Sequence, residues 1–388
     1  MKQPIRKRVA EANNINTSKS EYLLVLDMNN LLKISSVDHR MNDSGKEYGI
    51  VMSTLRMIGD ILKKKDFNYC YACYDGEGSG VMRWDLYPDY KANRDKHYEL
   101  YASEYFKKLN KFAKLVIENS KQNRVEKEGD SENDEESFER QKYTVQSILE
   151  ELCIRQFVFD NVEGDDIISY IVHNKKPNDK AVIVSSDKDL TQLISDTVIV
   201  YNPRIKGFIT KDNSVEKLGI THENVVLEKI LCGDSSDNIK GIKGLGETTL
   251  LKLFPELKTN KSDLETVIER SKAMLEERKA AKKKPLKSLE NIVNRVTDGC
   301  QGDKIYEINE KIIDLSVPLV TDDAREELDE SMYTPIDTSD RDIKNVYRII
   351  TENGMHDMVD ETRFGDILAP YSRIIMMENR RMKDFFGN

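Results

Sequence analysis

Short apolar runs alternate with longer amphipathic segments in the first half of the chain. Four apolar runs predict β-strands, at residues 22–26, 67–74, 180–186 and 197–201. The first and third runs are almost continuously aliphatic, which is typical of parallel strands that are covered on both faces. Helical periodicity marks four other segments, at 48–64, 144–156, 165–175 and 188–194. The alternation predicts an α/β fold with a mostly parallel central sheet flanked by helices.

The pattern changes after Tyr201 and predicts a second, helical region. Residues 232–254 read as two helical segments joined by a turn with several glycines, and residues 269–290 read as a basic helical insertion. We therefore expect three parts, a flexible tail at 1–20, a first domain at 21–215 and a helical C-terminal domain at 216–388.

An acidic stretch interrupts the first domain. Residues 126–140 hold eight Asp or Glu among fifteen positions and almost no apolar side chain. Such a composition cannot bury enough apolar surface to fold, so it predicts a disordered or mobile insertion.

The overall composition narrows the classes of protein only a little. No apolar run of the 388 residues approaches the roughly 18 needed to span a membrane, and the polar N-terminus has no apolar signal core. Five scattered cysteines fit a reducing compartment, so we expect a cytoplasmic protein, and we also expect a monomer. The net charge of −9 argues against nucleic acid as a binding partner. The charge is uneven, however, because residues 270–287 carry eight basic side chains and only two acidic ones.

Carboxylates gather where the predicted strands end. Asp27 ends the first strand, Asp75 the second, and Asp187 and Asp189 follow the third. Further candidates lie at a loop-to-helix junction and in the glycine-containing turn, namely Glu163, Asp165, Asp166, Asp234 and Asp237. Singly, each has an ordinary explanation as a helix cap or a solvated strand end. Together they suit the edge of an open α/β sheet, where sites form outside the carboxyl ends of the strands.

The size of the repulsion favours a metal site. Two carboxylates about 5 Å apart repel by about 3 kcal/mol at an effective dielectric constant of about 20, so six or seven in one pocket require protons or cations. Ligand sets made only of oxygen suit Mg²⁺, with Mn²⁺ as a substitute. Two such ions can clamp the attacking and leaving oxygens of a phosphodiester displacement. All nine carboxylates named above are therefore predicted metal ligands.

Basic and glycine-rich motifs point to nucleic acid. Arg83, Lys91 and Arg94 are interleaved with aromatic residues, so the cations could hold a phosphate and the rings could stack a base. A solvated loop with ordinary surface charge is the alternative. Residues 241–254 have the form of a helix-hairpin-helix, whose backbone amides bind phosphate without reading sequence.

The motifs VLDMNN, YDGEGSG, VEGDD, SSDKDLTQL and GDSSDNIKGIKGLGETT follow one another between about residues 20 and 255. Their order resembles that of the flap endonuclease/5′-nuclease superfamily, which has a PIN-like α/β catalytic domain. Within it, the chain is most similar to phage enzymes that remove RNA primers from the lagging strand. The resemblance implies a structure-specific nuclease with 5′→3′ exonuclease, flap endonuclease and ribonuclease H activities, acting by a two-metal mechanism.

The resemblance also implies residue roles. Asp27, Asp75, Glu163, Asp165 and Asp187 would surround the first ion, and Asp189 and Asp237 would serve the second, with Asp187 between them. Residues 95 to about 142 would form a helical arch with Arg83 and Lys91 at its base. The duplex backbone would contact a turn that holds a K⁺ ion, at Gly241, Lys243, Gly244 and Gly246. We add Lys282, Lys283 and Lys284 as further duplex contacts.

The expected partners are branched or nicked DNA, RNA–DNA hybrids and a single-strand-binding protein. A sliding clamp could bind Phe385 and Phe386 near the C-terminus, although a helix end packed on the core is the alternative. Two other functions stay open at this point. One is a non-catalytic DNA-binding protein on a nuclease fold, and the other is a PIN-type single-strand ribonuclease.

Overall fold

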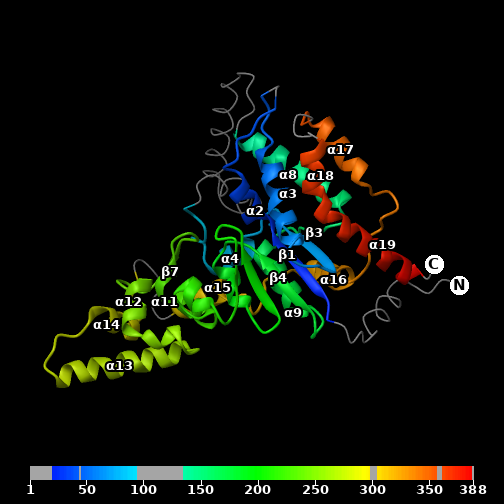
Figure 1. The fold of residues 1–388 in the computed structure, drawn as a ribbon. Coiled ribbons are helices and arrows are strands. Elements are labelled where there is room, and N and C mark those ends of the chain that lie inside the picture. The colour runs from blue at the N-terminus through cyan, green and yellow to red at the C-terminus, as the bar shows by residue number, and fades with distance from the viewer. Residues whose placement is uncertain (1–19, 43–44, 94–133, 298–303, 356–360, 387–388) are drawn as a thin grey trace.

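A six-stranded sheet forms the centre of the computed structural model, which describes residues 20–42, 45–93, 134–297, 304–355 and 361–386 (Figure 1). The strand order is β3-β2-β1-β4-β5-β6, in which all neighbours are parallel except β5 and β6. The strands are β1 (Tyr22–Asp27), β2 (Tyr69–Cys73), β3 (Arg155–Phe157), β4 (Lys180–Val184), β5 (Val198–Asn202) and β6 (Gly207–Ile209). The strand order reverses at β1, so the crevice beside the end of β1 is the expected place for a site.

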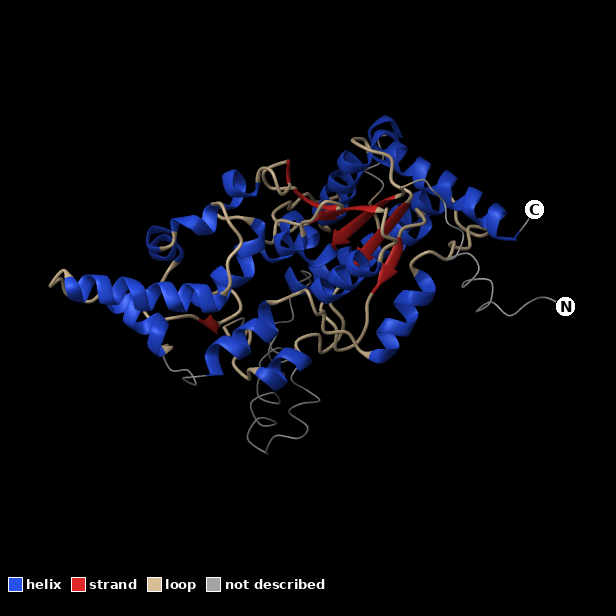
Figure 2. Cartoon of the chain, turned by 90° about the horizontal axis from the view of Figure 1, so that it is seen from below, coloured by secondary structure: helices blue, strands red, loops and turns tan. Residues whose placement is uncertain are grey.

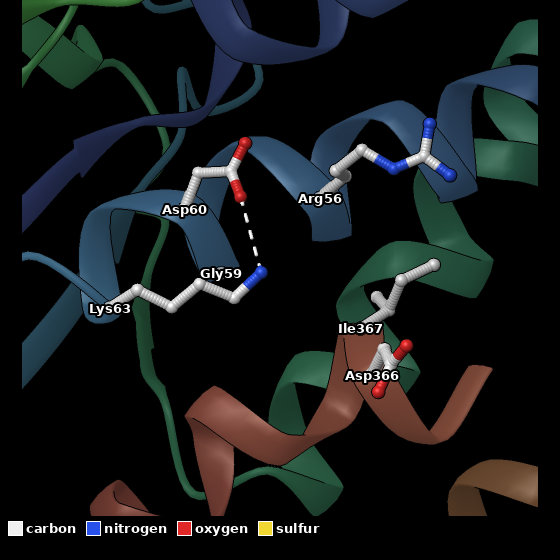
Figure 3. A pocket seen from close by; sticks show the side chains of 6 residues that line it. All are labelled: Arg56, Gly59, Asp60, Lys63, Asp366 and Ile367. Atoms are coloured by element: carbon white, nitrogen blue, oxygen red, sulfur yellow. Dashed lines mark hydrogen bonds and ion pairs between the residues drawn. The ribbon is translucent and has the colours of Figure 1, made fainter. Parts of the chain in front are cut away.

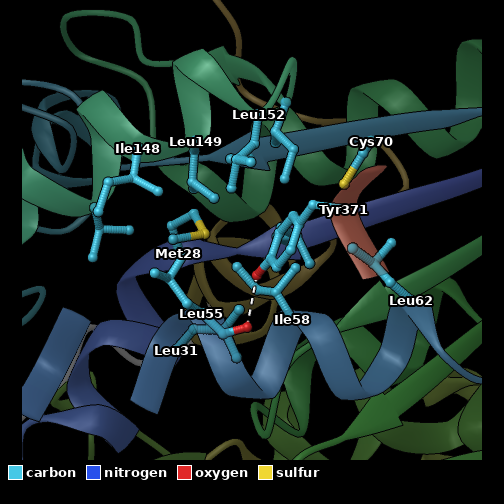
Figure 4. Close-up of a cluster of buried hydrophobic side chains, with 14 of the residues drawn as sticks. Met28, Leu31, Leu55, Ile58, Leu62, Cys70, Ile148, Leu149, Leu152 and Tyr371 are labelled. Atoms are coloured by element: carbon cyan, nitrogen blue, oxygen red, sulfur yellow. Dashed lines mark hydrogen bonds between the residues drawn. The ribbon is translucent and has the colours of Figure 1, made fainter. Parts of the chain in front are cut away.

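Alternate residues of β1 feed two separate hydrophobic cores. Leu24 and Leu26 point into one core, which contains Tyr371, whose hydroxyl donates to the Leu55 carbonyl over 2.7 Å (Figure 4). The helices that cover this face are α2 (Met28–Ser35), α3 (Gly49–Leu62), α8 (Asp134–Glu151), α17 (Ile343–Glu352), α18 (Glu361–Leu368) and α19 (Ser372–Phe386). The 3₁₀ turn η6 (Ala369–Tyr371) joins the last two.

The opposite face of the sheet has its own cover, and helices lie on both sides of the strands (Figure 2). Leu23 and Val25 point into this second core. Its covering elements are α9 (Gly164–Asn174), the 3₁₀ turn η1 (Asp189–Leu193) and α16 (Asp322–Ser331). Both faces of β1 are therefore dry, as its continuous aliphatic run predicts.

A third core holds the helical region together. Its helices are α4 (Val81–Leu86), α10 (Ser214–Leu218), α11 (Val225–Cys232), α12 (Glu247–Leu253), α13 (Leu264–Ala280), α14 (Lys287–Asn294) and α15 (Ile305–Ile313). Shorter elements complete it, the 3₁₀ turns η2 (His222–Asn224) and η3 (Pro255–Lys258) and the antiparallel pair β7 (Gly233–Asp234) and β8 (Ile239–Lys240). The helices α13 and α14 extend away from the sheet in Figures 1 and 2.

The predicted fold class is confirmed, and the four predicted strands correspond to β1, β2, β4 and β5. The predicted helix at 188–194 is instead the 3₁₀ turn η1. Two short strands, β3 and β6, were not predicted, because three residues are too few to establish an alternating pattern.

Two predicted boundaries differ from the structure. Residues after 315 do not belong to a separate helical domain, because Leu315, Leu328 and Met332 enter one core of the sheet and Phe364 and Tyr371 enter the other. The predicted disordered stretch at 126–140 overlaps α8, which begins at Asp134 and buries Ser137 and Gln141. The rest of that stretch, most of the predicted arch at 95–142 and the tail at 1–19 lie outside the described residues.

A small pocket lies between α3 and α18, lined by Arg56, Gly59, Asp60, Lys63, Asp366 and Ile367 (Figure 3). The chain returns through α3 to the start of β2, so this pocket lies toward the sheet edge that faces away from the carboxyl ends of the parallel strands. Its two cations and two carboxylates balance, which gives no preference for either sign of ligand. None of the helices in the described ranges combines the length and the apolar character that a membrane span requires.

Candidate active site

Four carboxylates come together at the carboxyl edge of the parallel strands. Asp27 is the last residue of β1, Asp75 follows β2, Asp187 follows β4, and Asp165 lies in the first turn of α9. The carboxylates of Asp27, Asp75 and Asp187 all raise the pKa of Asp165, which is a direct sign of their proximity. The parallel order of the strands therefore places these four predicted site residues at one edge.

Hydrogen bonds fix two of these carboxylates in place. The Asp27 carboxylate accepts from the Asn30 amide over 3.1 Å and from the Ser185 hydroxyl over 2.6 Å. The Asp75 carboxylate accepts from the Gly164 amide over 2.7 Å. Burial, together with the charges of Asp187 and Asp75, raises the pKa of Asp27 to about 7 despite these donors. The edge therefore holds oxygen ligands in fixed positions at a cost in charge repulsion.

Asp165 is the least compensated member of the group. Among the described residues, no cation and no hydrogen-bond donor contacts its carboxylate. Burial raises the pKa of Asp165 well above its ordinary value, and four neighbouring carboxylates add to the effect. A half-buried carboxylate among other carboxylates is destabilised as an anion, and a bound cation would relieve that cost. The donor set fits a hard divalent cation, because it consists of carboxylate oxygens alone.

Glu163 differs from these four because the chain supplies its counterions. Its carboxylate lies 2.7 Å from the Lys91 ammonium and 3.3 Å from the Arg83 guanidinium, and it accepts from the Tyr90 hydroxyl over 3.1 Å. Burial acts against the charge of Glu163, but Lys91 and Arg83 outweigh it and hold its pKa below the ordinary value. Glu163 therefore meets a metal only if Lys91 moves.

Arg83 and Asp166 form a buried pair rather than a nucleic-acid contact and a metal ligand. The Arg83 guanidinium contacts both Asp166 oxygens, at 2.5 and 3.1 Å, and its Nε donates to the Ile312 carbonyl. Asp166 also accepts from the Leu319 amide over 2.9 Å. Arg83 is only 3% exposed and its guanidinium is held by these partners, so the structure gives no support to its direct role with nucleic acid, which stays a prediction. The pair instead fixes the start of α9 against the segment before α16.

A second acidic group lies beside the first. Asp189, Asp234 and Asp237 each offer one carboxylate oxygen, and these three atoms lie within 4.8 Å of one another. The Asp189 amide donates to the Asp187 carboxylate over 2.9 Å, which links the two groups. In the described part of the chain, only this group brings three possible ligand atoms so close together.

Lys229 on α11 is a functional candidate that the sequence did not reveal. Its ammonium pairs with both Asp189 and Asp234 and is only 15% exposed. Burial raises the pKa of Asp189 to about 7, although Lys229 opposes the rise. For Asp234, Lys229 and Ser236 outweigh burial and lower the pKa to about 2. The Lys229 ammonium thus lies between two predicted metal ligands, where a metal ion would bind.

The segment after α4 attaches the helical region to the acidic edge. The Lys91 amide donates to the Asp237 carbonyl over 2.8 Å, and Asn93 donates to the Ser235 carbonyl over 2.7 Å. The interleaved aromatic residues do not face a base, because they are buried in the core of the helical region, at Trp84, Tyr87 and Tyr90. Their predicted stacking role is therefore wrong, and Tyr90 serves Glu163 instead.

The glycine-containing turn depends on close backbone contact. Gly241 directly follows β8 and lies against the residue before β7. An added Cβ at Gly241 would lie 2.1 Å from the Cys232 backbone, so only glycine fits there. Gly244 has a φ of +74°, and neither it nor Gly246 has an atom within 4 Å of an added Cβ. Lys243, Gly244 and Gly246 are exposed. The turn therefore presents bare backbone to solvent, as a helix-hairpin-helix would.

The remaining candidates lie apart from this edge. Lys282, Lys283 and Lys284 are exposed at the end of α13. Arg94 lies outside the described residues. Phe385 is half-buried in the last turn of α19, and no contact there bears on the clamp prediction.

The sequence matches a known family over more than half of its length. Residues 23–228 match the family described as 5′-3′ exonuclease, N-terminal resolvase-like domain. The 5′-3′ exonuclease of Mycoplasmopsis pulmonis is 27% identical over 276 residues, which cover 69% of this chain and 79% of that protein. The DNA polymerase I of Bacillus subtilis is 36% identical over 140 residues, which cover 34% of this chain but only 16% of the polymerase.

A solved structure shares the fold at low sequence identity. The flap endonuclease D15 of bacteriophage T5, in a pseudo-enzyme-product complex with DNA and metal ions, superposes with a TM-score of 0.55. Its identity is 19%, and the alignment covers 85% of this chain and 99% of that chain. The family match at residues 23–228 includes nearly all of β1, with Asp27 at its end, and β4 with the acidic residues after it. This match shows that the chain belongs to the 5′-3′ exonuclease family.

Proposed function

We propose that the chain is a divalent-metal-dependent 5′-nuclease that hydrolyses phosphodiesters of branched or nicked DNA and of RNA–DNA hybrids. The observation that carries the proposal is the uncompensated carboxylate of Asp165, held among Asp27, Asp75 and Asp187 at the carboxyl edge of the sheet. A carboxylate with a purely structural role would have a donor or a cation as its partner, because partial burial beside other carboxylates disfavours its charged form. Membership of the 5′-3′ exonuclease family supports phosphodiester hydrolysis as the reaction.

The donor set supports two Mg²⁺ ions, with Mn²⁺ as a substitute. We assign the first ion to Asp27, Asp75, Asp165 and Asp187, and the second to Asp189, Asp234 and Asp237. Bound there, the ions would offset the carboxylate repulsion and stabilise the negative charge that develops on the phosphate. Asp166 is left out, since Arg83 and Leu319 already occupy its oxygens.

The chain's own residues set the geometry of the site. Ser185 and the Asn30 amide hold Asp27, and the Gly164 amide holds Asp75, so these two carboxylates are fixed in place before any ion binds. Lys91 lies at the acidic edge with 21% of its side chain exposed, which leaves its ammonium able to turn from Glu163 to a phosphate. The same cation would then hold the reacting phosphate beside the carboxylates.

The glycine-containing turn is the proposed contact with duplex backbone. Gly244 and Gly246 let a phosphate approach the main chain, and Lys243 adds a positive charge. Such contacts read no sequence, which suits an enzyme that recognises strand ends and branches. The predicted K⁺ ion at this turn belongs to the same proposal.

The experiment that tests the proposal compares 5′-labelled flap, nicked duplex and RNA–DNA hybrid with free single-stranded RNA. We expect cleavage of the first three in Mg²⁺, products with 5′ phosphates, and no cleavage in EDTA. Cleavage of single-stranded RNA alone would favour a PIN-type ribonuclease, and tight binding without cleavage would favour a non-catalytic DNA-binding protein. Activity on the hybrid would support the removal of RNA primers in phage lagging-strand replication.

A further inference from the structure

A helical hairpin, formed by α13, α14 and the connecting residues 281–286, projects from the helical region (Figures 1 and 2). Apolar side chains anchor mainly its base, where Val267, Ile268, Leu289 and Ile292 are buried in the third core, whereas Leu286 is only partly buried against it. Residues 279–285 are all exposed. Burial of apolar surface therefore explains the base of the hairpin and does not explain its tip.

The tip concentrates positive charge. Residues 278–287 hold six basic side chains and no acidic one. Only Lys279 pairs loosely, at 3.8 Å from Glu276. The lysines at 282, 283, 284 and 287 form no ion pair with any residue in the described ranges. The acidic residues of the two helices, at 265, 269, 276, 277 and 290, all lie outside the tip.

The tip is an ordered turn. Lys282 has a φ of +56°, and the Lys283 amide donates to the Arg278 carbonyl over 2.8 Å. The Arg278 guanidinium donates in turn to the Lys284 carbonyl over 2.9 Å. Like charges about 4 Å apart repel by about 1 kcal/mol even in water. The ordered turn therefore gathers several cations on one short segment, and a polyanion would offset their mutual repulsion.

The hairpin is joined directly to the glycine-containing turn. The Asn291 side chain on α14 donates to the Lys243 carbonyl over 2.8 Å, and the Lys243 amide donates to the Val296 carbonyl over 2.9 Å. From Asn291 back to Lys287 the helix rises about 6 Å, and the extended segment to Lys283 adds up to about 14 Å. The main chain at the tip thus lies at most about 20 Å from the turn, which corresponds to at most about six base pairs of duplex at 3.4 Å each.

We propose that the tip of the α13–α14 hairpin is a second contact for duplex nucleic acid, up to about six base pairs beyond the contact at the glycine-containing turn. The inference rests on the proposed function and deepens it, since it makes the length of the duplex a determinant of substrate choice. The ligand chemistry is the phosphate backbone, because the tip offers lysine ammoniums and no aromatic side chain. An acidic protein partner is the competing occupant.

The test measures the affinity of the full chain for blunt DNA duplexes of increasing length, at several salt concentrations and without divalent ions. The tip variant is K282E/K283E/K284E. The matched control is K63E/K64E/K65E, which reverses three consecutive exposed lysines at the end of α3. Thermal unfolding of both variants checks that the fold is intact.

We expect the affinity of the unaltered protein to rise with duplex length and then to level off. In the tip variant the rise should end sooner, by up to about six base pairs, and binding of the longest duplex should weaken at least tenfold. The slope of log K against log salt should become less steep by about 2 to 3, since each phosphate contact contributes about 0.9. The control variant should follow the unaltered protein.

Three results would overturn the inference: an unchanged length dependence and salt slope, equal losses in the tip and control variants, or unchanged duplex binding together with loss of a protein partner. Cleavage of a flap on a short duplex separates this inference from the proposed function. If the unaltered protein does not cut that flap in Mg²⁺, the proposed function fails. If it cuts the flap while the tip variant keeps the full length dependence, only the hairpin inference fails.

Discussion

Replacing Asp27 by Asn separates the stability that the charge of the acidic edge costs from the stability that metal binding at this edge provides. Asp27 is 7% exposed, and burial, with Asp187 and Asp75, raises its pKa from 3.8 to about 7. Between these two pH values the folded protein keeps a proton that the unfolded chain has released. Stability is therefore lost as pH rises through this window, and above it the full cost is about 4 kcal/mol, at about 1.4 kcal/mol per pH unit.

The Asn side chain keeps the shape and the hydrogen bonds of Asp27. Its carbonyl oxygen can accept from the Asn30 amide, and its NH₂ can donate to the Ser185 hydroxyl. In EDTA at pH 8 we expect the variant to be more stable than the unaltered protein by up to about 4 kcal/mol. At pH 4 the difference should approach zero. Urea unfolding at both pH values measures it.

A divalent ion should narrow this difference. Saturating Mg²⁺ stabilises the protein that binds it, by about 2.7 kcal/mol at one hundred times the Kd. The unaltered protein should gain this stability at pH 8, and the variant should gain less because it lacks one ligand. A variant that is less stable than the unaltered protein in EDTA at pH 8, or a difference that does not depend on pH, would refute the reasoning.

Three further predictions concern single residues. Lys229→Gln should tighten Mn²⁺ binding at least tenfold in calorimetric titration, because Asp189 and Asp234 lose their resident ammonium; unchanged or weaker binding would contradict this. Arg83→Gln should lower the free energy of unfolding by about 3–5 kcal/mol, since Asp166 and Glu163 stay buried without their partner; a loss below about 1 kcal/mol in urea would argue against the pair. Gly241→Ala should lower the melting temperature, because its Cβ would lie 2.1 Å from the Cys232 backbone, whereas Gly246→Ala meets no atom within 4 Å; equal melting temperatures would show that the close contact is not needed.

The sequence predicted the parts of the fold that depend on local pattern. The aliphatic runs of β1 and β4 were readable because both faces of these strands are buried. Carboxylates at strand ends were readable because parallel strands end at one edge of a sheet. The packing of the helices α17, α18 and α19 against the sheet could not be predicted from local pattern. It depends on long-range contacts of Val346, Phe364 and Tyr371 with α3 and its neighbours.

Pairing between distant side chains was also beyond the sequence. Arg83 looked like a surface cation because its local sequence is polar and aromatic, yet its partner Asp166 lies on another element. Lys229 sits in an apolar helix with no motif around it, and only the fold brings it between Asp189 and Asp234. A lone lysine five residues before Asp234 was the one signal available.

Cleavage of a 5′-labelled flap by the Asp165→Asn variant in Mg²⁺, with DNA binding measured in parallel, tests the central claim most directly. Asp165 has no counterion among the described residues. A bound cation should therefore stabilise its negative charge more than that of any other carboxylate at the edge. The account predicts that the unaltered protein cuts the flap, and that the variant binds it with similar affinity and does not cut it. Full cleavage by the variant would contradict the assignment of the acidic edge as a metal-dependent active site.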